Sequence, residues 1–210
     1  MPKNHSIRIL LVDDHPILRE GLAAILGAQD GMRVAGEAGS GEEAIAIYDS
    51  CRPDVTLMDL RLPGMSGAEA IAEIRAAWPE ARIVVLSSYA GDEDIHRCLQ
   101  AGAAGYLLKD MLRKELIEAI RAVHAGETYL PQVVRARLEE RLRHEPLTPR
   151  ETQIVALIAQ GYSNREISHS IGASEGTVRI HVSHILAKLG VADRTQAAVQ
   201  AIKRGIVPPP

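Results

Sequence analysis

The first 125 residues alternate short apolar runs with longer amphipathic segments. The apolar runs predict five strands, at Ile7–Val12, Arg33–Glu37, Asp54–Met58, Arg82–Ser87 and Gly105–Leu108. Patterns with helical periodicity follow each run, at about 16–27, 41–51, 67–77, 92–101 and 112–125. The Ser40/Glu43 and Ser66/Glu69 pairs have the spacing of a capping box, which starts a helix. Strands that alternate with helices predict an α/β fold, with a five-stranded parallel, doubly wound sheet covered on both faces.

The pattern changes after residue 126. A charged segment with helical spacing, Val133–Arg143, predicts a linker that forms either a helix or a mobile tether. From Leu147 onward the periodicity is helical only, and Thr148 begins a capping box with proline at the first helical position. The sequence therefore predicts a first domain at 1–126, a linker at 127–146 and a small all-α domain of four helices at 147–210.

The charge of the chain is distributed unevenly between these parts. Residues 1–130 carry 13 Lys and Arg against 20 Asp and Glu, whereas residues 131–210 carry 11 against 7. An acidic N-terminal part and a basic C-terminal part indicate two domains with different partners. Chance variation in surface charge is the alternative explanation of this difference. The start of the chain lacks the apolar stretch of a signal peptide, and no run is long enough for a membrane helix. With only two cysteines, far apart, we expect reduced thiols and a cytoplasmic protein.

Polar side chains follow four of the five predicted strands at the point where each strand ends. Asp13 and Asp14 follow the first strand, Asp59 the third, Ser87 ends the fourth and Lys109 follows the fifth. Parallel strands bring their carboxyl ends to one edge of a sheet, where ligands bind. Crowded carboxylates favour a divalent cation, and an all-oxygen site suits Mg²⁺. A carboxylate can also attack phosphorus, so this edge predicts a phosphoryl-transfer site, with Lys109 and Ser87 binding the phosphoryl oxygens.

Four sequence blocks at this edge resemble the receiver domain of response regulators. They are DDHP at 13–16, LMDLRLPGMSG at 57–67, VVLSSY at 84–89 and AGAAGYLLKD at 101–110. The resemblance implies a flavodoxin-like sheet with strand order 2-1-3-4-5 and Asp59 as the phosphoryl acceptor. It also implies that Mg²⁺ is held by Asp14, Asp59 and the backbone carbonyl of Arg61, with Asp13 acting through water, and that Ser87 and Tyr106 form a switch pair. Many receivers have proline after the lysine, where this chain has Asp110.

The helical patterns at 163–189 have the character of a helix-turn-helix. Val178, Val182, Ile185 and Leu189 recur at helical spacing and predict a buried stripe. The outer face would then present candidate DNA contacts, at which Arg179 can read guanine and Ile180 can touch a thymine methyl. These candidates are Thr177, Arg179, Ile180, Ser183 and Lys188. From periodicity alone, a packing or dimerisation domain is an equal alternative.

The sequence from Leu147 to Val191 resembles the DNA-binding domain of the NarL/FixJ (LuxR-type) family. The resemblance implies a third helix that reads DNA and a fourth that pairs two copies, for which the candidate residues are Ala197, Ala198, Ala201 and Ile202. Together the two resemblances imply a two-component response regulator. A sensor histidine kinase would phosphorylate Asp59 and thereby control binding of a homodimer to a double-stranded DNA operator.

Three alternatives remain open at this point. A phosphatase of the haloacid dehalogenase type would need a second acid two residues after Asp59, where this chain has Arg61, so we expect a regulator and not an enzyme acting on other substrates. A receiver-like interaction protein or regulator that acts independently of phosphorylation is the second alternative. A LuxR-type sensor of a small ligand is the third, and the acidic cluster disfavours it.

Overall fold

The computed structural model describes residues 6–88, 91–110 and 113–208, and the chain divides into two compact units. The first unit comprises residues 1–89 and 95–135, and the second comprises 90–94 and 136–210. Among the described residues, no helix combines the length and the apolar character needed to cross a membrane.

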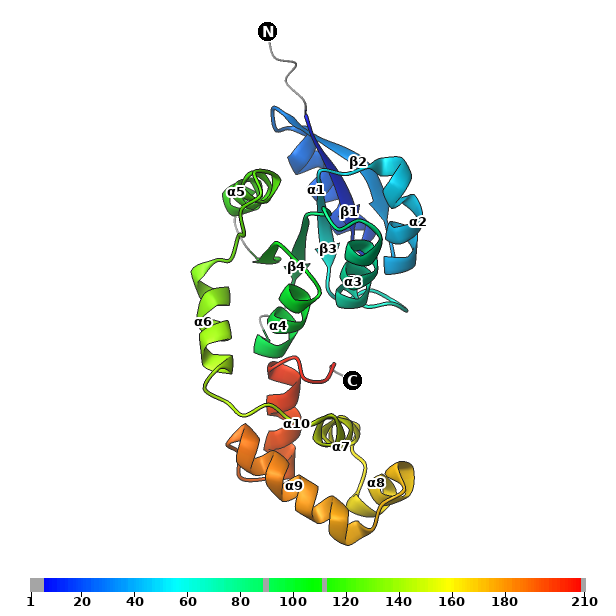
Figure 1. Ribbon diagram of the computed structural model, residues 1–210, viewed down its shortest axis with the longest axis vertical. Helices are drawn as coiled ribbons and strands as arrows, with labels where there is room; N and C mark the ends of the chain where they lie inside the picture. The colour runs from blue at the N-terminus through cyan, green and yellow to red at the C-terminus, as the bar shows by residue number, and fades with distance from the viewer. Residues whose placement is uncertain (1–5, 89–90, 111–112, 209–210) are drawn as a thin grey trace. The chain divides into compact units, whose positions relative to one another are not determined.

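The first unit is built on a parallel sheet with the order β2-β1-β3-β4-β5, which confirms the predicted fold class (Figure 1). The strands are β1 Ile7–Val12, β2 Met32–Ala38, β3 Val55–Asp59, β4 Ile83–Ser87 and β5 Gly105–Leu108. The helices that follow them are α1 Pro16–Gly27, α2 Gly41–Cys51, α3 Gly67–Ala77, α4 Asp92–Gln100 and α5 Arg113–His124. The predicted start of the last helix at residue 112 lies outside the described residues.

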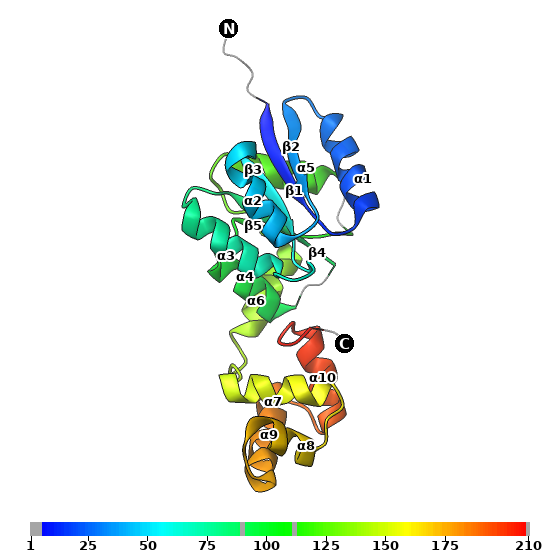
Figure 2. The ribbon, with the colours of Figure 1, turned by 90° about the vertical axis from the view of Figure 1, so that its right-hand side faces the viewer.

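The helices cover both faces of the sheet (Figure 2). The chain adds β2 on one side of β1 and β3 to β5 on the other, and right-handed crossovers in opposite directions place their helices on opposite faces. Leu26 of α1 and Ile120 of α5 join one core with alternate residues of the strands, such as Leu11 and Leu57. The remaining helices, α2 to α4, lie on the opposite face. The sheet is therefore buried on both sides, which explains why its strands read as continuous apolar runs in the sequence.

Local hydrogen bonds account for the helix starts. Ser66 forms a complete capping box with Glu69. At the start of α2, Ser40 accepts from the Glu43 backbone N–H, but the Glu43 carboxylate accepts from Gly39 and not from Ser40, so only half of the predicted box is present.

After α5 the chain returns to the edge of the sheet. Tyr129 forms a single parallel bridge with Gly105, in which the Tyr106 N–H donates to the Tyr129 carbonyl at 3.1 Å. The charged segment that follows is a helix, α6 Gln132–Arg141, as one of the two alternatives for the linker predicted.

The second unit contains four further helices around their own apolar core. They are α7 Pro149–Ala159, α8 Asn164–Ile171, α9 Glu175–Leu189 and α10 Arg194–Lys203. Capping boxes at Thr148 and Ser163 start α7 and α8, and Gly172, with φ of 65°, ends α8 in the left-handed conformation that glycine adopts most easily. A tight turn and the Ser174 cap then begin α9, which completes the predicted helix-turn-helix.

Gly67 is where α3 approaches the carboxyl end of β3 most closely. A Cβ atom at this position would lie 2.1 Å from the Asp59 carbonyl oxygen, so Gly67→Ala must displace backbone. We expect this change to destabilise the first unit by about 1–3 kcal/mol. Urea unfolding followed by the fluorescence of Trp78, the only tryptophan, measures this, because its ring lies 4.6 Å from that of Tyr48 in the same unit.

The matched control is Gly21→Ala, in the exposed interior of α1. A Cβ atom at Gly21 meets nothing within 4 Å, and alanine favours the helix, so this variant should gain about 0.5–1 kcal/mol. Equal stability of the two variants would contradict the steric account of Gly67.

Candidate functional site

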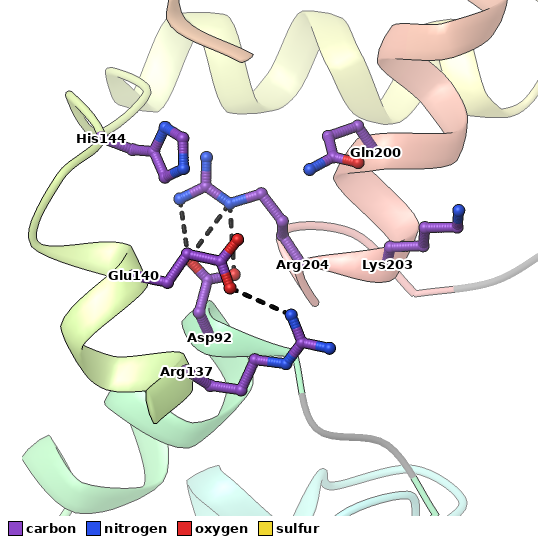
Figure 3. A pocket seen from close by; sticks show the side chains of 7 residues that line it. All are labelled: Asp92, Arg137, Glu140, His144, Gln200, Lys203 and Arg204. Atoms are coloured by element: carbon purple, nitrogen blue, oxygen red, sulfur yellow. Dashed lines mark hydrogen bonds and ion pairs between the residues drawn. The ribbon is translucent and has the colours of Figure 1, made fainter. Parts of the chain in front are cut away.

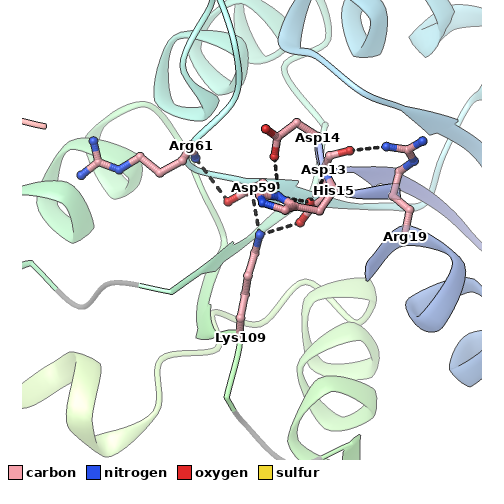
Figure 4. Close-up of polar contacts among 7 residues, drawn as sticks. All are labelled: Asp13, Asp14, His15, Arg19, Asp59, Arg61 and Lys109. Atoms are coloured by element: carbon pink, nitrogen blue, oxygen red, sulfur yellow. Dashed lines mark hydrogen bonds and ion pairs between the residues drawn. The ribbon is translucent and has the colours of Figure 1, made fainter. Parts of the chain in front are cut away.

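The carboxyl edge of the sheet brings together side chains from three strands (Figure 4). Asp13 follows β1 and Asp59 ends β3, and these two strands pair directly. Lys109, which follows β5, places its Nζ atom 2.6 Å from Asp13 Oδ2 and 2.7 Å from Asp59 Oδ2. Asp13 and Asp59 are each only 2% exposed. The predicted acidic edge is thus a compact site in which one ammonium group bridges two buried carboxylates.

Burial and charge act against each other on these groups. Burial raises the pKa of Asp59, and the Asp13 charge raises it further, whereas the hydrogen bond and charge of Lys109 oppose the rise. Burial alone would lower the pKa of Lys109, but its hydrogen bonds to Asp13 and Asp59 outweigh this effect and raise it. The lysine therefore stays charged at neutral pH and offsets part of the repulsion between the carboxylates.

A divalent cation fits the residues at this edge. Ligand atoms of Asp13, Asp14, His15 and Asp59 all lie within 4.8 Å of one another. Three of the four are carboxylates, which are the ligands that hard cations prefer. From its position, His15 is either a metal ligand or a partly exposed residue at a helix start, and the second is expected. It precedes α1 as the N-cap residue with a side chain 71% exposed, and its Nδ1 atom lies 2.7 Å from Asp14 Oδ1.

Arg61 contacts the site through its backbone. Its N–H donates to Asp59 Oδ1 at 3.2 Å, whereas its side chain extends away from the carboxylates (Figure 4). The position two residues after Asp59 therefore brings no further acid to the site, in agreement with the argument from sequence against a phosphatase of the dehalogenase type.

The predicted switch residues lie inside the unit. Ser87 and Tyr106 are each 0% exposed, and β4 and β5 hold them through their register, which pairs Val85 with Tyr106. The Lys109 backbone N–H donates to the Ser87 carbonyl at 2.8 Å, so the hydroxyl-bearing residue and the lysine are linked through the backbone. Tyr106 has its ring buried in this structure. No cis peptide bond occurs in the parts of the chain that the structure describes, those around Lys109 included.

The outward face of α9 carries most of the candidate DNA contacts. Val178, Ile185 and Leu189 are buried, as the stripe predicted, and Val182 packs partly against the same core. Arg179 is 71% exposed at its side chain and pairs only loosely with Glu175, at 3.7 Å, while Ile180 is 59% exposed. Thr177 and Ser183 are also exposed, and the Ser183 hydroxyl donates to the Arg179 carbonyl.

Two groups of predicted residues are placed differently from the expectation. Ala197 and Ala201 are 0% exposed and belong to the core of the second unit, so the prediction that they pair two copies is wrong. Ala198 and Ile202 are partly buried against the same core. Lys188 is 14% exposed at its side chain and its ammonium contacts the carboxylates of Glu145 and Glu151, not open solvent.

A pocket of about 440 Å³ in the second unit is lined by Asp92, Arg137, Glu140, His144, Gln200, Lys203 and Arg204 (Figure 3). Arg204 donates to both carboxylate oxygens of Asp92, at 2.8–3.2 Å, and Arg137 pairs with Glu140 at 3.0 Å. Both guanidinium groups in this pocket are thus already paired with carboxylates. The pocket is therefore a weak candidate for an anion site, and the acidic edge of the sheet remains the stronger candidate for a ligand site.

Comparison with known proteins agrees with both units. Residues 9–121 match the family model of the response regulator receiver domain, and residues 145–201 match that of bacterial regulatory proteins of the luxR family. The chain belongs to the LuxR-type (NarL/FixJ) response regulators. This response regulator therefore combines a receiver domain with a LuxR-type DNA-binding domain.

Several relatives match over nearly the whole of both chains. The chain is 43% identical over 209 residues to the transcriptional regulatory protein LiaR of Bacillus subtilis, covering 96% of this chain and 99% of LiaR. It is 42% identical over 213 residues to YxjL of Bacillus subtilis, covering 96% and 98%. The crystal structure of the response regulator ChrA, from a heme-sensing two-component system, aligns with a TM-score of 0.59 and 34% identity, covering 96% of this chain and 99% of ChrA.

Proposed function

We propose that Asp59 accepts a phosphoryl group from a sensor histidine kinase and that this modification controls binding of the regulator to a DNA operator. The observation that carries the proposal is the contact of Lys109 with both Asp13 and Asp59, both buried at one edge of the sheet. A structural salt bridge would need one carboxylate, whereas Lys109 contacts two, and Asp14 lies close to both of them. Three acids beside one lysine suit a cation and a phosphoryl group. The proposed setting is the cytoplasm.

The residues at this edge would divide the chemistry among them. A carboxylate oxygen of Asp59 would attack phosphorus and form an acyl phosphate, while the donor histidine leaves. Asp14, Asp59 and the Arg61 carbonyl would hold Mg²⁺, with Asp13 acting through water, and the bound ion would offset charge on the phosphoryl oxygens. Lys109 and the Ser87 hydroxyl would bind those oxygens, and Tyr106 would respond to the movement of Ser87.

Phosphorylation of Asp59 would give the Lys109 ammonium new hydrogen-bond partners, and this change would drive the switch. A phosphoryl group adds about −1.5 to −2 charges and three strong acceptors. Lys109, which bonds Asp13 and Asp59 in this structure, would gain the phosphoryl oxygens as partners only in the modified state. A difference of a few kcal/mol in such contacts shifts a two-state equilibrium by about a hundredfold or more.

The proposed DNA contacts are those on the outward face of α9. Arg179 and Ile180 would reach base edges in the major groove, and Thr177 and Ser183 lie on the same exposed face. Two copies on an operator with two half-sites would double these contacts. The residues that pair the copies must lie outside Ala197 and Ala201, because these two alanines are buried within each copy.

The first prediction concerns the acceptor. Asp59→Asn should abolish the acyl phosphate formed with acetyl phosphate and Mg²⁺, because the amide is a poor nucleophile. The increase in DNA affinity that follows phosphorylation of the parent should disappear as well. Phosphate-affinity electrophoresis and a DNA-binding titration measure the two effects. The control is Asp49→Asn, an exposed carboxylate on α2.

The two measurements also separate this proposal from its alternative. Full labelling of the Asp59→Asn variant would place the acceptor elsewhere. Complete labelling of the parent without any change in DNA affinity would favour a regulator that acts independently of phosphorylation.

The second prediction concerns the metal. Asp13→Asn removes a carboxylate that would bind the ion through water, and such a loss lowers metal affinity about 10- to 100-fold. Titration calorimetry with Mg²⁺ measures this, again with Asp49→Asn as the control. Unchanged Mg²⁺ affinity in the Asp13 variant would remove Asp13 from the proposed metal site.

The third prediction concerns DNA. Arg179→Ala should weaken operator binding by about 1–3 kcal/mol if the guanidinium reads a base. Its surface pair with Glu175 contributes little to stability, so the fold should be preserved. Binding is compared at matched salt with Arg33→Ala, which removes an exposed arginine from β2 of the receiver domain. Equal affinities of the two variants would exclude Arg179 as a contact.

A further inference from the structure

Lys188 lies at the last turn of α9, and its ammonium has three oxygen partners within the DNA-binding domain. Its Nζ atom is 2.9 Å from Glu151 Oε2, 3.1 Å from Glu145 Oε1 and 3.3 Å from the Pro146 carbonyl oxygen. The side chain is 14% exposed, which is far below the 71% of Arg179 on the same helix. Lys188 thus faces the start of α7, unlike the residues that face outward from α9.

Glu151 is the main partner of Lys188 and has a second role. It is 3% exposed, and its Oε2 atom accepts from the Thr148 N–H at 2.8 Å as well as from Lys188. The same carboxylate oxygen therefore closes the capping box of α7 and holds the end of α9. Sequence spacing indicated the first contact but not the second.

A neighbouring residue fixes the other side of the helix-turn-helix. Arg150 Nη2 donates to the Ile171 carbonyl at 2.7 Å, and Ile171 is the last residue of α8. Two consecutive residues in the first turn of α7 thus contact both ends of α9. Arg150 contacts the turn before it, and Glu151 contacts Lys188 in its last turn.

The charges favour this arrangement over a contact with DNA. Burial by itself raises the pKa of Glu151, but hydrogen bonds from Thr148 and Lys188 outweigh burial and lower it. The bonds to Glu151 and Glu145 raise the pKa of Lys188. Both groups are therefore charged at neutral pH. If Lys188 moved to a DNA phosphate, the buried Glu151 carboxylate would lose its cation, which is unfavourable.

We propose that Lys188 is a positioning residue for DNA recognition, which fixes the end of α9 to the first turn of α7 and so sets where Arg179 and Ile180 project. The proposal rests on the proposed DNA-binding function and replaces the direct DNA contact predicted from sequence for Lys188. Lys188 lies nine positions after Arg179, about 14 Å along the helix axis, so a small tilt at one end moves the other by about an ångström or more. Hydrogen bonds to base edges do not tolerate such a displacement.

The test uses the full-length protein with two duplexes. One is selected from a random pool with the parent protein, and the other is an unselected duplex of equal length. Lys188→Gln is compared with Lys188→Arg, which keeps the charge, and with Lys203→Gln, which removes an exposed lysine from α10. Affinity is measured for both duplexes as a function of salt, well below the unfolding temperature of every variant.

We expect Lys188→Gln to lose at least about tenfold in affinity for the selected duplex. Its affinity for the unselected duplex and its salt slope should equal those of Lys203→Gln, and Lys188→Arg should restore most of the loss. In nuclear magnetic resonance spectra, the amide signals of Thr177 and Ile180 should shift in the Lys188→Gln variant, although these residues lie more than two helical turns away.

Other results would overturn the proposal. A salt slope that falls by about 0.9 relative to the Lys203 control, with equal losses for both duplexes, would make Lys188 a phosphate contact. Unchanged affinities with a lower unfolding temperature would make it a stabilising residue only. If Lys188→Gln does not fold, Glu151→Gln, which retains the size of the side chain, takes its place with the same expected outcomes.

The proposed function can fail separately. If the parent protein does not prefer its selected duplex to the unselected one, sequence-specific DNA binding itself is refuted, and the positioning role falls with it. A preference in the parent that persists unchanged in Lys188→Gln refutes the positioning role alone.

Discussion

The placement of one ammonium group between two buried carboxylates is the constraint on which the receiver domain depends. Lys109 lies within 2.7 Å of both Asp13 and Asp59, and each acid is only 2% exposed, so water offsets little of its charge. The contact requires the carboxyl ends of β1, β3 and β5 to lie at one edge, which the parallel sheet provides. Because burial raises the pKa of Asp59 while Lys109 opposes the rise, any group that gives Lys109 a new partner also changes the electrostatic balance at Asp59.

The sheet and its edge could be predicted from the sequence because both depend on local patterns. A strand buried on both faces must be apolar throughout, and a polar residue directly after it must lie at the strand end. The sequence alone therefore predicts that Asp13, Asp59 and Lys109 lie at this edge. The bridge between Tyr129 and Gly105 was not predictable in this way. This bridge pairs a single residue after α5 with β5. A single paired residue produces no alternation of apolar and polar positions from which a strand could be predicted.

Residues whose role depends on a distant partner could not be assigned from sequence. Arg204 contacts Asp92 across 112 positions, and Lys188 contacts Glu151 across 37, and neither separation leaves a pattern. Ala197 and Ala201 show a related ambiguity. Small apolar residues at helical spacing predict a packed face, but the same face serves to join two copies or to approach a neighbouring helix closely. Ala197 and Ala201 are completely buried in the core of the DNA-binding domain, so their face packs against neighbouring helices of the same copy.

The position of Lys188 changes the expected balance between affinity and specificity in DNA binding. A lysine on phosphate adds affinity for every sequence and steepens the dependence on salt. Since Lys188 is paired within the protein, Arg179 is the one Lys or Arg side chain among the five candidate contacts that projects outward. Its neighbour on that face, Ile180, carries no charge, and the contact proposed for it is with a thymine methyl. Recognition by such a face depends more on the direction of α9 than on its charge, and that direction is determined by the contacts of Arg150 and Glu151 in the first turn of α7.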